Sequence, residues 1–341
     1  MTSQPQDQLA LRILQSVQPQ LPKNRSVGIG CIGAGFIMAD CHLAAYSQHG
    51  LRPVAINSRS HSKAAAVASR WQIPTVCSTV EEVVAQPDVQ VLDVAVPPDC
   101  QADVIRRALN APHQLTGILA QKPLGTNCRE AVEIVRLCEQ HQVTLAVNQN
   151  MRYDQSMRVL KQIIDQNALG KIIFAQIDMH AIPHWQDFLK SYDRLTYSNM
   201  SVHHLDVLRF LFGDPSDVTT LTRTDPRTTF PHKDGITVST LNFPSGVMAV
   251  SLEDVWSGPR QDGYDNDQNI TYRVEGTEGV AKGTIGWPTG SASTLTYAST
   301  TATGGKWETP SWKTMWFPHA FIGVMEQLQY RSEERRVGKE C

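Results

Sequence analysis

The feature that most constrains the fold lies near the amino terminus, where a predicted buried strand leads directly into a glycine turn and a helix. The strand is Val27–Ile32, the turn contains Gly33 and Gly35, and the helix is expected over 39–48. Gly33 permits a tight turn, Gly35 lets the backbone approach a pyrophosphate, and the amino end of the helix offers N–H donors to it. Met38 stands where a third glycine would complete the GxGxxG pattern, so the match is to GxG alone. The pattern predicts a dinucleotide-binding unit, with an ordinary strand-to-helix turn as the alternative.

Short apolar runs alternate with helical patterns from residue 25 to residue 150, which is typical of a doubly wound parallel sheet flanked by helices. Strands are expected at Val27–Ile32, Arg52–Asn57, Thr75–Cys77, Val91–Val96, Gly117–Ala120 and Thr144–Asn148. Helices are expected at Ser62–Trp71, Val80–Ala85, Cys100–Asn110 and Cys128–His141. Asn127, with Glu130 three residues later, predicts a capping box at the start of the last of these helices.

From about residue 172 the pattern changes to strands joined by hairpin-like turns. Strands are expected at Ile172–His180, Thr237–Phe243, Val247–Asp254, Tyr272–Glu275 and Leu295–Tyr297, with a tight loop at 244–246. This half is therefore predicted to be a largely antiparallel sheet with one face covered and one face free. The expected organisation is an N-terminal extension over 1–24, a first domain over 25–150 and a second domain over 151–330.

The last eleven residues, Arg331–Cys341, are similar to the translated product of a common DNA-sequencing adapter. We therefore leave them out of all fold reasoning. The natural protein is expected to continue past Tyr330 with other residues, and a charged native helix is the alternative. Loss of a final segment that packs on the body is expected to lower the stability of the chain as written.

Composition excludes several classes of protein. A length of 341 residues suits two domains, and a net charge of -2 without a basic run makes nucleic acid an unexpected partner. The seven cysteines form no CxxC pair and no metal-ligand spacing, so reduced thiols and no metal site are expected. Residues 1–23 lack the basic start and apolar core of a secretory signal, and no stretch reaches membrane-spanning length. A cytoplasmic protein without a membrane partner is expected.

Gln121-Lys122-Pro123 follows directly after the predicted strand Gly117–Ala120. Ligands collect at the carboxyl ends of the strands in an open parallel sheet, so the Lys122 ammonium group is well placed for chemistry. Proline stiffens the backbone beside it. An ordinary turn that carries a lysine is the alternative.

A second candidate cluster surrounds His203 in the run 199–206, which leads into an apolar helical stretch. On a helix His203 and Asp206 lie one turn apart on the same face, so the carboxylate can orient the imidazole and favour its protonated form. His203 is thus a candidate general base. A pair of hydrogen-bonded histidines at a domain seam is the alternative, and a metal site is less favoured because no third ligand is evident.

Taken together and in this order, four segments resemble the glucose–fructose oxidoreductase, inositol dehydrogenase and MocA (Gfo/Idh/MocA) family: the GAGF turn at 33–36, Gln121-Lys122-Pro123, the run 147–153 and the His203 segment. The run Val-Glu-Gly-Thr-Glu-Gly at 274–279 also fits, and the resemblance spans roughly 25–330. It implies an N-terminal Rossmann domain, an open-faced sheet domain, and a nicotinamide cofactor between them. It also implies oxidation or reduction of a carbinol or carbonyl carbon on a sugar or polyol.

The resemblance assigns roles to individual residues. Lys122 matches the family's catalytic lysine and His203 its catalytic histidine. His203 would accept the hydroxyl proton as hydride leaves the substrate, and Lys122 would stabilise the developing oxyanion, so the two are expected to converge. Contacts to the cofactor are expected from Gly33, Gly35, Phe36, Ile37, Ser58, Arg59, Pro97, Gln121 and Lys122. Contacts to the substrate are expected from Arg152, Tyr153, Asn199 and His203.

The chain departs from the family pattern at two positions. Gln121 replaces the glutamate of the family's EKP, and Asn199 replaces the aspartate four residues before the histidine. An amide keeps the hydrogen-bonding shape, but it cannot take a proton or stabilise a neighbouring cation as a carboxylate does. We expect a working NAD(P)-dependent oxidoreductase because Lys122 and His203 both persist. The alternatives are an NAD-assisted glycosidase or lyase, which consumes no net cofactor, and a non-catalytic nucleotide-binding sensor, which the two amides favour.

The choice of cofactor depends on the end of the second strand, where an acidic residue usually holds the ribose hydroxyls of NAD. Here Ser58 is neutral and Arg59 offers a guanidinium to a 2′-phosphate, so NADP is expected to bind at least as readily as NAD. A solvent-facing arginine without a phosphate is the alternative.

His184 and Trp185 follow the first strand of the second domain and are further candidates for substrate contact. Trp185 offers a ring that can stack on a sugar, and His184 offers hydrogen bonds. A place in the core or in a subunit interface is the alternative. A homo-oligomer that associates through the second sheet is expected, because such sheets commonly mediate self-association in the family.

Overall fold

The computed structural model describes residues 24–181, 187–256, 267–286 and 290–337. Contacts divide the chain into two compact units, which meet in the sequence between Asn150 and Met151. The parallel-sheet unit comprises the described residues 24–150 and 317–337, and the open-sheet unit comprises those within 151–316. Residues 317–337 return to the first unit, so the chain enters the parallel-sheet unit twice.

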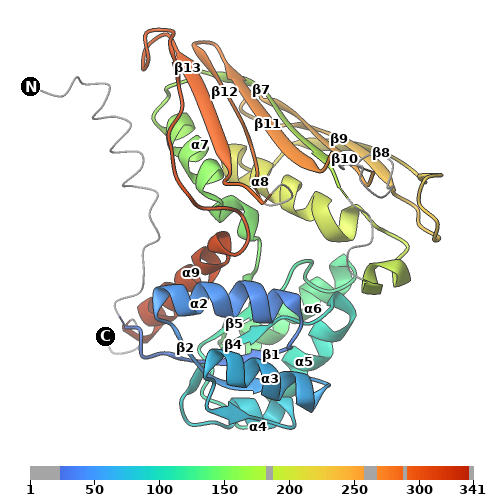
Figure 1. Ribbon diagram of the computed structural model, residues 1–341, viewed down its shortest axis with the longest axis vertical. Coiled ribbons are helices and arrows are strands. Elements are labelled where there is room, and N and C mark those ends of the chain that lie inside the picture. The colour runs from blue at the N-terminus through green and yellow to red at the C-terminus, as the bar shows by residue number, and fades with distance from the viewer. Residues whose placement is uncertain (1–23, 182–186, 257–266, 287–289, 338–341) are drawn as a thin grey trace, which may run out of the picture. The chain divides into compact units, whose positions relative to one another are not determined.

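The parallel-sheet unit contains a six-stranded sheet in the order β3-β2-β1-β4-β5-β6, and all neighbouring strands are parallel (Figure 1). This confirms the predicted doubly wound sheet, whose strand order reverses between β1 and β4. The strands are β1 Gly28–Ile32, β2 Arg52–Asn57, β3 Thr75–Val76, β4 Val89–Val94, β5 Gly117–Ala120 and β6 Thr144–Val147. The fourth strand was expected at 91–96 and lies two residues earlier, because the chain must turn at Ala95 to reach the proline-led helix.

The helices of this unit are η1 Ile37–His42, α2 Leu43–His49, α3 His61–Trp71, α4 Val80–Val84, α5 Pro98–Asn110, α6 Cys128–Gln140, η5 His319–Phe321 and α9 Ile322–Val337. The helix expected over 39–48 begins earlier, with a π-helical turn in which the Leu43 N–H donates to the Met38 carbonyl. Helix α5 starts at Pro98 because a proline at the first helical position gives up no hydrogen bond.

The predicted cap of α6 is confirmed in one half. Asn127 accepts a hydrogen bond from the Glu130 backbone N–H at 3.1 Å. The Glu130 carboxylate, however, accepts from the Thr126 backbone N–H and hydroxyl, at 2.6 and 2.7 Å, and thus reaches one residue further back than a capping box requires. The contact with Asn127 satisfies a donor that the first helical turn leaves unpaired, and the contact with Thr126 fixes the chain just before the helix.

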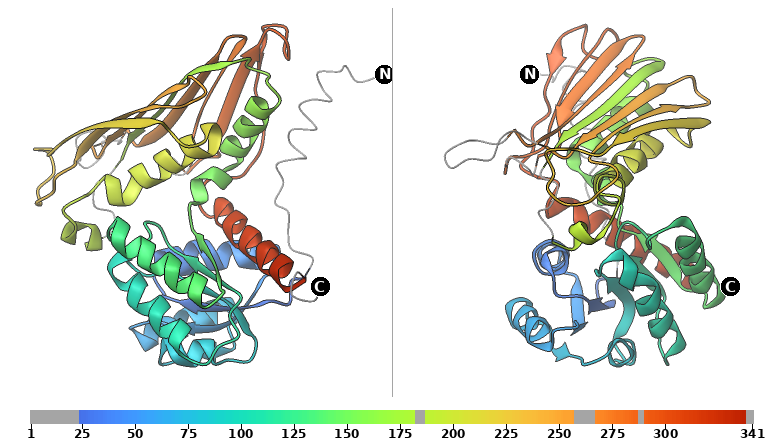
Figure 2. Two further views of the ribbon diagram at one scale, coloured as in Figure 1. Left: turned by 180° about the vertical axis from the view of Figure 1, so that it is seen from behind. Right: turned by 90° about the vertical axis from the view of Figure 1, so that its right-hand side faces the viewer.

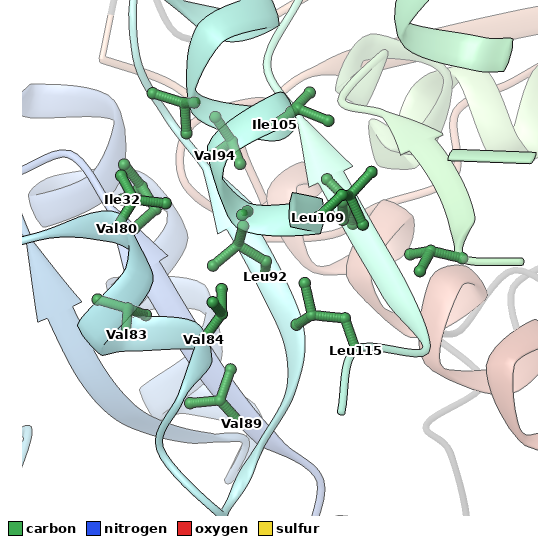
Figure 3. Packing of buried hydrophobic residues seen from close by; sticks show 14 of the residues in the cluster. Ile32, Val80, Val83, Val84, Val89, Leu92, Val94, Ile105, Leu109 and Leu115 are labelled. Atoms are coloured by element: carbon green, nitrogen blue, oxygen red, sulfur yellow. The ribbon is translucent and has the colours of Figure 1, made fainter. Parts of the chain in front are cut away.

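The core of the parallel-sheet unit lies between the sheet and the helices α4 and α5. Figure 3 shows Val83 of α4 and Ile105 and Leu109 of α5 close to Leu92 and Val94 of β4. All five side chains are buried. Burial of side chains of this size stabilises a fold by about 1.5 to 3 kcal/mol each, so this cluster holds α4 and α5 against the sheet.

A buried polar network joins the first helices to the sheet. The Asp93 carboxylate on β4 lies 2.6 Å from Nδ1 of His42 and accepts the Tyr46 hydroxyl at 2.6 Å. The Asn148 amide, just after β6, donates to Nε2 of His42 at 2.9 Å. With this amide orientation, His42 carries its proton on Nδ1 and donates it to Asp93. No more than 1% of any of these four side chains is exposed, so each depends on the others for its hydrogen bonds.

The open-sheet unit contains an eight-stranded sheet in the order β14-β13-β12-β11-β7-β10-β9-β8. Among the described strands of this sheet only β7 and β10 pair in parallel, which confirms the predicted, largely antiparallel sheet. The strands are β7 Ile172–His180, β8 Asp217–Arg223, β9 Ile236–Asn242, β10 Met248–Asp254, β11 Asn269–Gly276, β12 Gly279–Thr284, β13 Thr294–Ser299 and β14 Trp307–Glu308.

One face of this sheet is covered by the helices α7 Gln155–Asp165 and α8 Val202–Phe212 (Figure 2). Shorter turns are η2 Asn150–Tyr153, η3 Asp187–Ser191 and the π-helical η4 Tyr197–Ser201, which continues into α8. Along β7, β9 and β10 the side chains alternate between buried and partly exposed, so buried residues such as Ala175, Leu241 and Ala249 face the helices. The partly exposed side chains of the same strands point to the opposite face of the sheet, which is called the open face below.

We predict that Asp93→Ala lowers the free energy of unfolding by about 3 to 5 kcal/mol, because it leaves a buried imidazole and phenol without their acceptor. Urea denaturation of the full chain measures the loss. Asp88→Ala is the matched control, because the Asp88 ion pair with Arg52 is about half exposed and exposed pairs contribute little. Equal losses in the two variants would contradict the role given to the network.

Candidate functional site

The glycine turn lies at the carboxyl end of β1 and depends on Gly33. Its φ is +112°, and a Cβ atom at this position would lie 2.4 Å from the Ala95 carbonyl oxygen. The Gly33 N–H donates to the Asn57 carbonyl at 2.8 Å, at the end of β2. Only glycine fits this conformation and this space. The turn lies where the strands β1, β2 and β4 end.

Gly35 faces open space, since no atom lies within 4 Å of the position where its Cβ would be. Its carbonyl accepts the Ala39 N–H at 2.8 Å, so the helical segment starts directly behind it. Phe36 is 40% exposed and stacks on Phe317 with ring centroids 6.3 Å apart, and Ile37 is half-buried. A bare backbone at the amino end of a helix fits a pyrophosphate group, so these residues can hold a dinucleotide.

Three further residues predicted to contact the cofactor lie at the same edge of the sheet. Ser58, half-buried, and Arg59, exposed, follow β2, and Pro97 precedes α5 after β4. Burial raises the pKa of Cys100 in the first turn of α5, and the positive charge of Arg59 opposes this effect. The Arg59 guanidinium is thus near enough to α5 to act on its first turn.

Gln121 and Lys122 follow β5 at this edge. The Gln121 N–H donates to the Val94 carbonyl at 3.1 Å, and its side-chain oxygen accepts the Lys122 N–H at 2.8 Å. The Lys122–Pro123 peptide bond is cis. Burial lowers the pKa of Lys122 from 10.5 to about 7, because a charged amine loses water there. An amine that titrates near neutral pH at the ligand edge of a parallel sheet can exchange a proton or stabilise an oxyanion.

His203 lies in the first turn of α8 in the open-sheet unit. Only 2% of its surface is exposed, and its ring meets Trp316 edge-on with centroids 5.1 Å apart. The next residue, His204, is held by a different group: its Nδ1 lies 3.0 Å from the Glu253 carboxylate, which also accepts the Ser251 hydroxyl at 2.6 Å. The two neighbouring histidines therefore have separate surroundings.

Asp206 has a partner that the sequence did not predict. Both of its carboxylate oxygens accept hydrogen bonds from Arg152, with Nε at 2.8 Å and Nη2 as the second donor. The Arg152 guanidinium also lies over the ring of Phe210 at 5.3 Å. A bidentate arginine is a strong partner for a carboxylate, so Asp206 anchors Arg152, and its effect on His203 stays a prediction. The contact of Arg152 with substrate stays a prediction, as does that of Tyr153 in η2.

Asn199 lies in the π-helical turn that leads into α8, and Asp234 fixes the start of this turn. The Asp234 carboxylate is fully buried and accepts the backbone N–H groups of Leu195, Thr196 and Tyr197, the last at 3.0 Å. Nothing in the sequence analysis pointed to this role of Asp234. An aspartate followed by glycine is typical of exposed turns, so only the fold reveals that it is buried.

His184 and Trp185 lie outside the described residues. Within the described ranges no cluster of three or more His, Cys, Asp or Glu side chains has the arrangement of a metal site. Among those same residues no helix has both the length and the apolar character needed to cross a bilayer.

Lys122 belongs to the parallel-sheet unit and His203 to the open-sheet unit, so their convergence stays a prediction.

Two family models match this chain. An oxidoreductase family with an NAD-binding Rossmann fold matches residues 27–149, and the GFO/IDH/MocA C-terminal domain matches residues 157–282. Together they cover most of the two units described above.

Some curated relatives of this chain carry the name of a sugar or polyol. The chain is 30% identical to an inositol 2-dehydrogenase of Gluconacetobacter diazotrophicus over 54% of both proteins. It is 26% identical to a 1,5-anhydro-D-fructose reductase of Ensifer adhaerens over 64% of this chain and 67% of that protein. The aligned region thus spans about half to two thirds of the length of these relatives.

Among solved structures, a levoglucosan dehydrogenase in complex with NADH and levoglucosan matches with a TM-score of 0.74. Its sequence is 18% identical, and the match covers 90% of each chain, so it supports the fold. The glycine turn, the two sheets and both family models agree, and this chain belongs to the Gfo/Idh/MocA oxidoreductase family.

Proposed function

We propose that this chain is an NAD(P)-dependent dehydrogenase or reductase that acts on a carbinol or carbonyl carbon of a sugar, polyol or related compound. The observation that carries the proposal is the Lys122 amine, whose pKa burial lowers to about 7 at the edge that also holds the glycine turn. The substrate class follows from the names of the inositol and anhydrofructose relatives.

Each candidate catalytic residue has one task in this proposal. A bound nicotinamide dinucleotide would supply hydride exchange. In the oxidative direction His203 takes the proton of the substrate hydroxyl, and the protonated Lys122 stabilises the alkoxide that forms. In the reductive direction Lys122 polarises the carbonyl oxygen and His203 returns the proton. The backbone of Gly33 and Gly35 would hold the pyrophosphate, with Phe36, Ile37 and Pro97 beside it.

Lys122 imposes a pH limit on this chemistry. With a pKa of about 7, the amine loses its proton as the pH rises through neutrality. An oxyanion is stabilised only by the protonated form, so activity falls on the alkaline side. The family's glutamate would oppose this fall by favouring the charged amine, and Gln121 cannot.

We also propose that Arg59 lets this chain accept NADP. Its guanidinium is exposed directly after β2, and β2 carries no acidic residue at its carboxyl end. A guanidinium binds a phosphate through charge-assisted hydrogen bonds, whereas the ribose hydroxyls of NAD give it no such partner.

Self-association through the open face is a further part of the proposal. Leu221 on β8, Met248 on β10 and Trp307 on β14 all lie on this face by strand register, with 73%, 51% and 52% of their surfaces exposed. Large exposed apolar side chains on one sheet face favour association with another protein surface, here a second copy.

A cytoplasmic location is also part of the proposal. All described cysteines are free thiols, which suits the reducing cytoplasm.

We predict that the full chain reduces NAD or NADP with at least one member of a polyol and aldose panel, and that Lys122→Met lowers kcat by about 10²- to 10⁴-fold. Reduced-cofactor absorbance measures both.

We predict that Gln121→Glu shifts the pH at which kcat/KM falls on the alkaline side upward by about one unit or more, because a carboxylate favours the charged amine. Gln90→Glu, at the amino end of β4, is the matched control and should leave this pH unchanged.

Undiminished turnover in Lys122→Met would contradict the proposed chemistry. Cofactor binding without turnover on any panel member would favour the sensor. Substrate cleavage without net cofactor reduction would favour the NAD-assisted glycosidase or lyase.

We predict that Arg59→Ala weakens NADP binding by about tenfold or more and leaves NAD binding unchanged, because the lost guanidinium contacts only the 2′-phosphate. Isothermal titration of both cofactors measures the difference. Arg107→Ala, which removes an exposed guanidinium paired with Glu81, is the control and should change neither constant. Equal NADP affinity in Arg59→Ala and the unmodified chain would remove the argument.

We predict that Leu221→Asp combined with Met248→Asp converts the oligomer to a monomer, because two carboxylates would have to lose water in the interface. Sedimentation velocity of the full chain measures the change. Val218→Asp is the matched control, since Val218 is 49% exposed on the same strand but points to the opposite face. A monomeric unmodified chain, or an oligomer that survives the double substitution, would contradict the proposal.

A further inference from the structure

Gln101 connects helix α5 to the segment that carries Lys122. Its side chain is fully buried. Its amide nitrogen donates to the Gln121 carbonyl at 2.8 Å and to the Pro123 carbonyl at 3.1 Å, and its amide oxygen accepts the Gly125 N–H at 3.3 Å. One side chain therefore holds three backbone groups of a five-residue segment, 121–125.

These contacts lie on both sides of Lys122. The two carbonyls that accept from Gln101 belong to the residues immediately before and after the lysine. The third contact fixes Gly125, whose φ of +68° lets the chain turn away toward α6. The backbone of Lys122 is thus bounded on each side, and its own N–H is taken by the Gln121 side chain.

Glutamine is suited to this task because it offers two donors and an acceptor on one planar group. An ionised glutamate would present only acceptors to two carbonyl oxygens and repel them. Asparagine is one methylene shorter and moves the amide back toward its own helix. A methionine has nearly the same length and shape but makes none of the three hydrogen bonds.

Helix α5 gives Gln101 a rigid base. Val104, Ile105, Ala108 and Leu109 on the same helix are all buried in the core of the parallel-sheet unit. A side chain on a helix anchored in this way holds its partners more precisely than one on a loop. Gln101 therefore ties three backbone groups of the 121–125 segment to a helix that is anchored in the core.

We propose that Gln101 is the positioning residue for Lys122, and that its three hydrogen bonds hold the 121–125 segment so that the amine stays at the carboxyl edge of the parallel sheet. The role in turnover rests on the proposed function, whereas the role in holding the segment does not. Without the clamp, the segment opens toward solvent and the amine regains water. Its pKa then returns toward 10.5, the ordinary value of lysine.

The test compares Gln101→Met with the unmodified full chain in two measurements that need no substrate. The first is amide hydrogen exchange of the 121–125 segment and of β5. The second is the pH dependence of Lys122 acylation by acetic anhydride, read by mass spectrometry, which gives the pKa of the amine. We expect exchange to rise at least tenfold over 121–125 but not in β5, and the pKa to rise by one unit or more.

Gln329→Met is the matched control. Gln329 on α9 is 1% exposed in the same unit, and neither its amide nitrogen nor its amide oxygen has a hydrogen-bond partner among the described residues. The same chemical change there should leave both readouts unchanged. A response equal to that of Gln101→Met would show that any loss of a buried amide disturbs the unit, which would overturn the proposal.

Two further outcomes would overturn it. Exchange that rises equally in β5 and in 121–125 would make Gln101 a general stabiliser, and an unchanged Lys122 pKa would show that the segment keeps its place without the clamp. If Lys122→Met leaves turnover intact while Gln101→Met opens the segment, the proposed function fails and the clamp stands. If Lys122→Met abolishes turnover while Gln101→Met changes neither readout, the clamp fails alone.

Discussion

The reversal of strand order between β1 and β4 is the constraint on which the candidate site depends. All strands of the six-stranded sheet are parallel, so every carboxyl end lies at one edge. Because the strand order reverses between β1 and β4, the chain segments that follow these two strands lead away from each other at that edge. This topology brings the glycine turn, Arg59 and Lys122 to one edge from segments far apart in the sequence. The chemistry proposed for the chain thus follows from how its sheet is wound.

Buried neutral and charged hydrogen-bonding groups then fix what the topology assembles. Asp93 ties the first helices to the sheet, Gln101 holds the segment around Lys122, and Asp234 fixes the turn that leads into the helix of His203. Each of these side chains is fully buried and binds backbone or side-chain groups that would otherwise lose their partners. Loops near a catalytic site keep one conformation when such contacts define it.

Sequence periodicity predicted the parts of the fold that have strong apolar patterns. The six parallel strands and the glycine turn followed from buried runs and from residue types with a local conformational reason. Strands β8 and β12 were not expected, because every residue of β8 is exposed and β12 has glycine at two positions, so neither shows an apolar alternation. Long-range partners were also beyond reach: the Asp206 carboxylate was assigned to a neighbour one turn away, yet Arg152 takes it from 54 residues earlier. Lys122 could be identified from its place after a strand, whereas the Gln101 side chain that holds the segment around it could not be identified from the sequence.

The central claim is that the Lys122 amine and the His203 imidazole act on one substrate atom. A crystal structure of the full chain with NADPH and a polyol that it oxidises tests this most directly. The account predicts that Nζ of Lys122 and a ring nitrogen of His203 both lie within hydrogen-bonding distance of the same substrate oxygen. A substrate bound with either group directed elsewhere would contradict it.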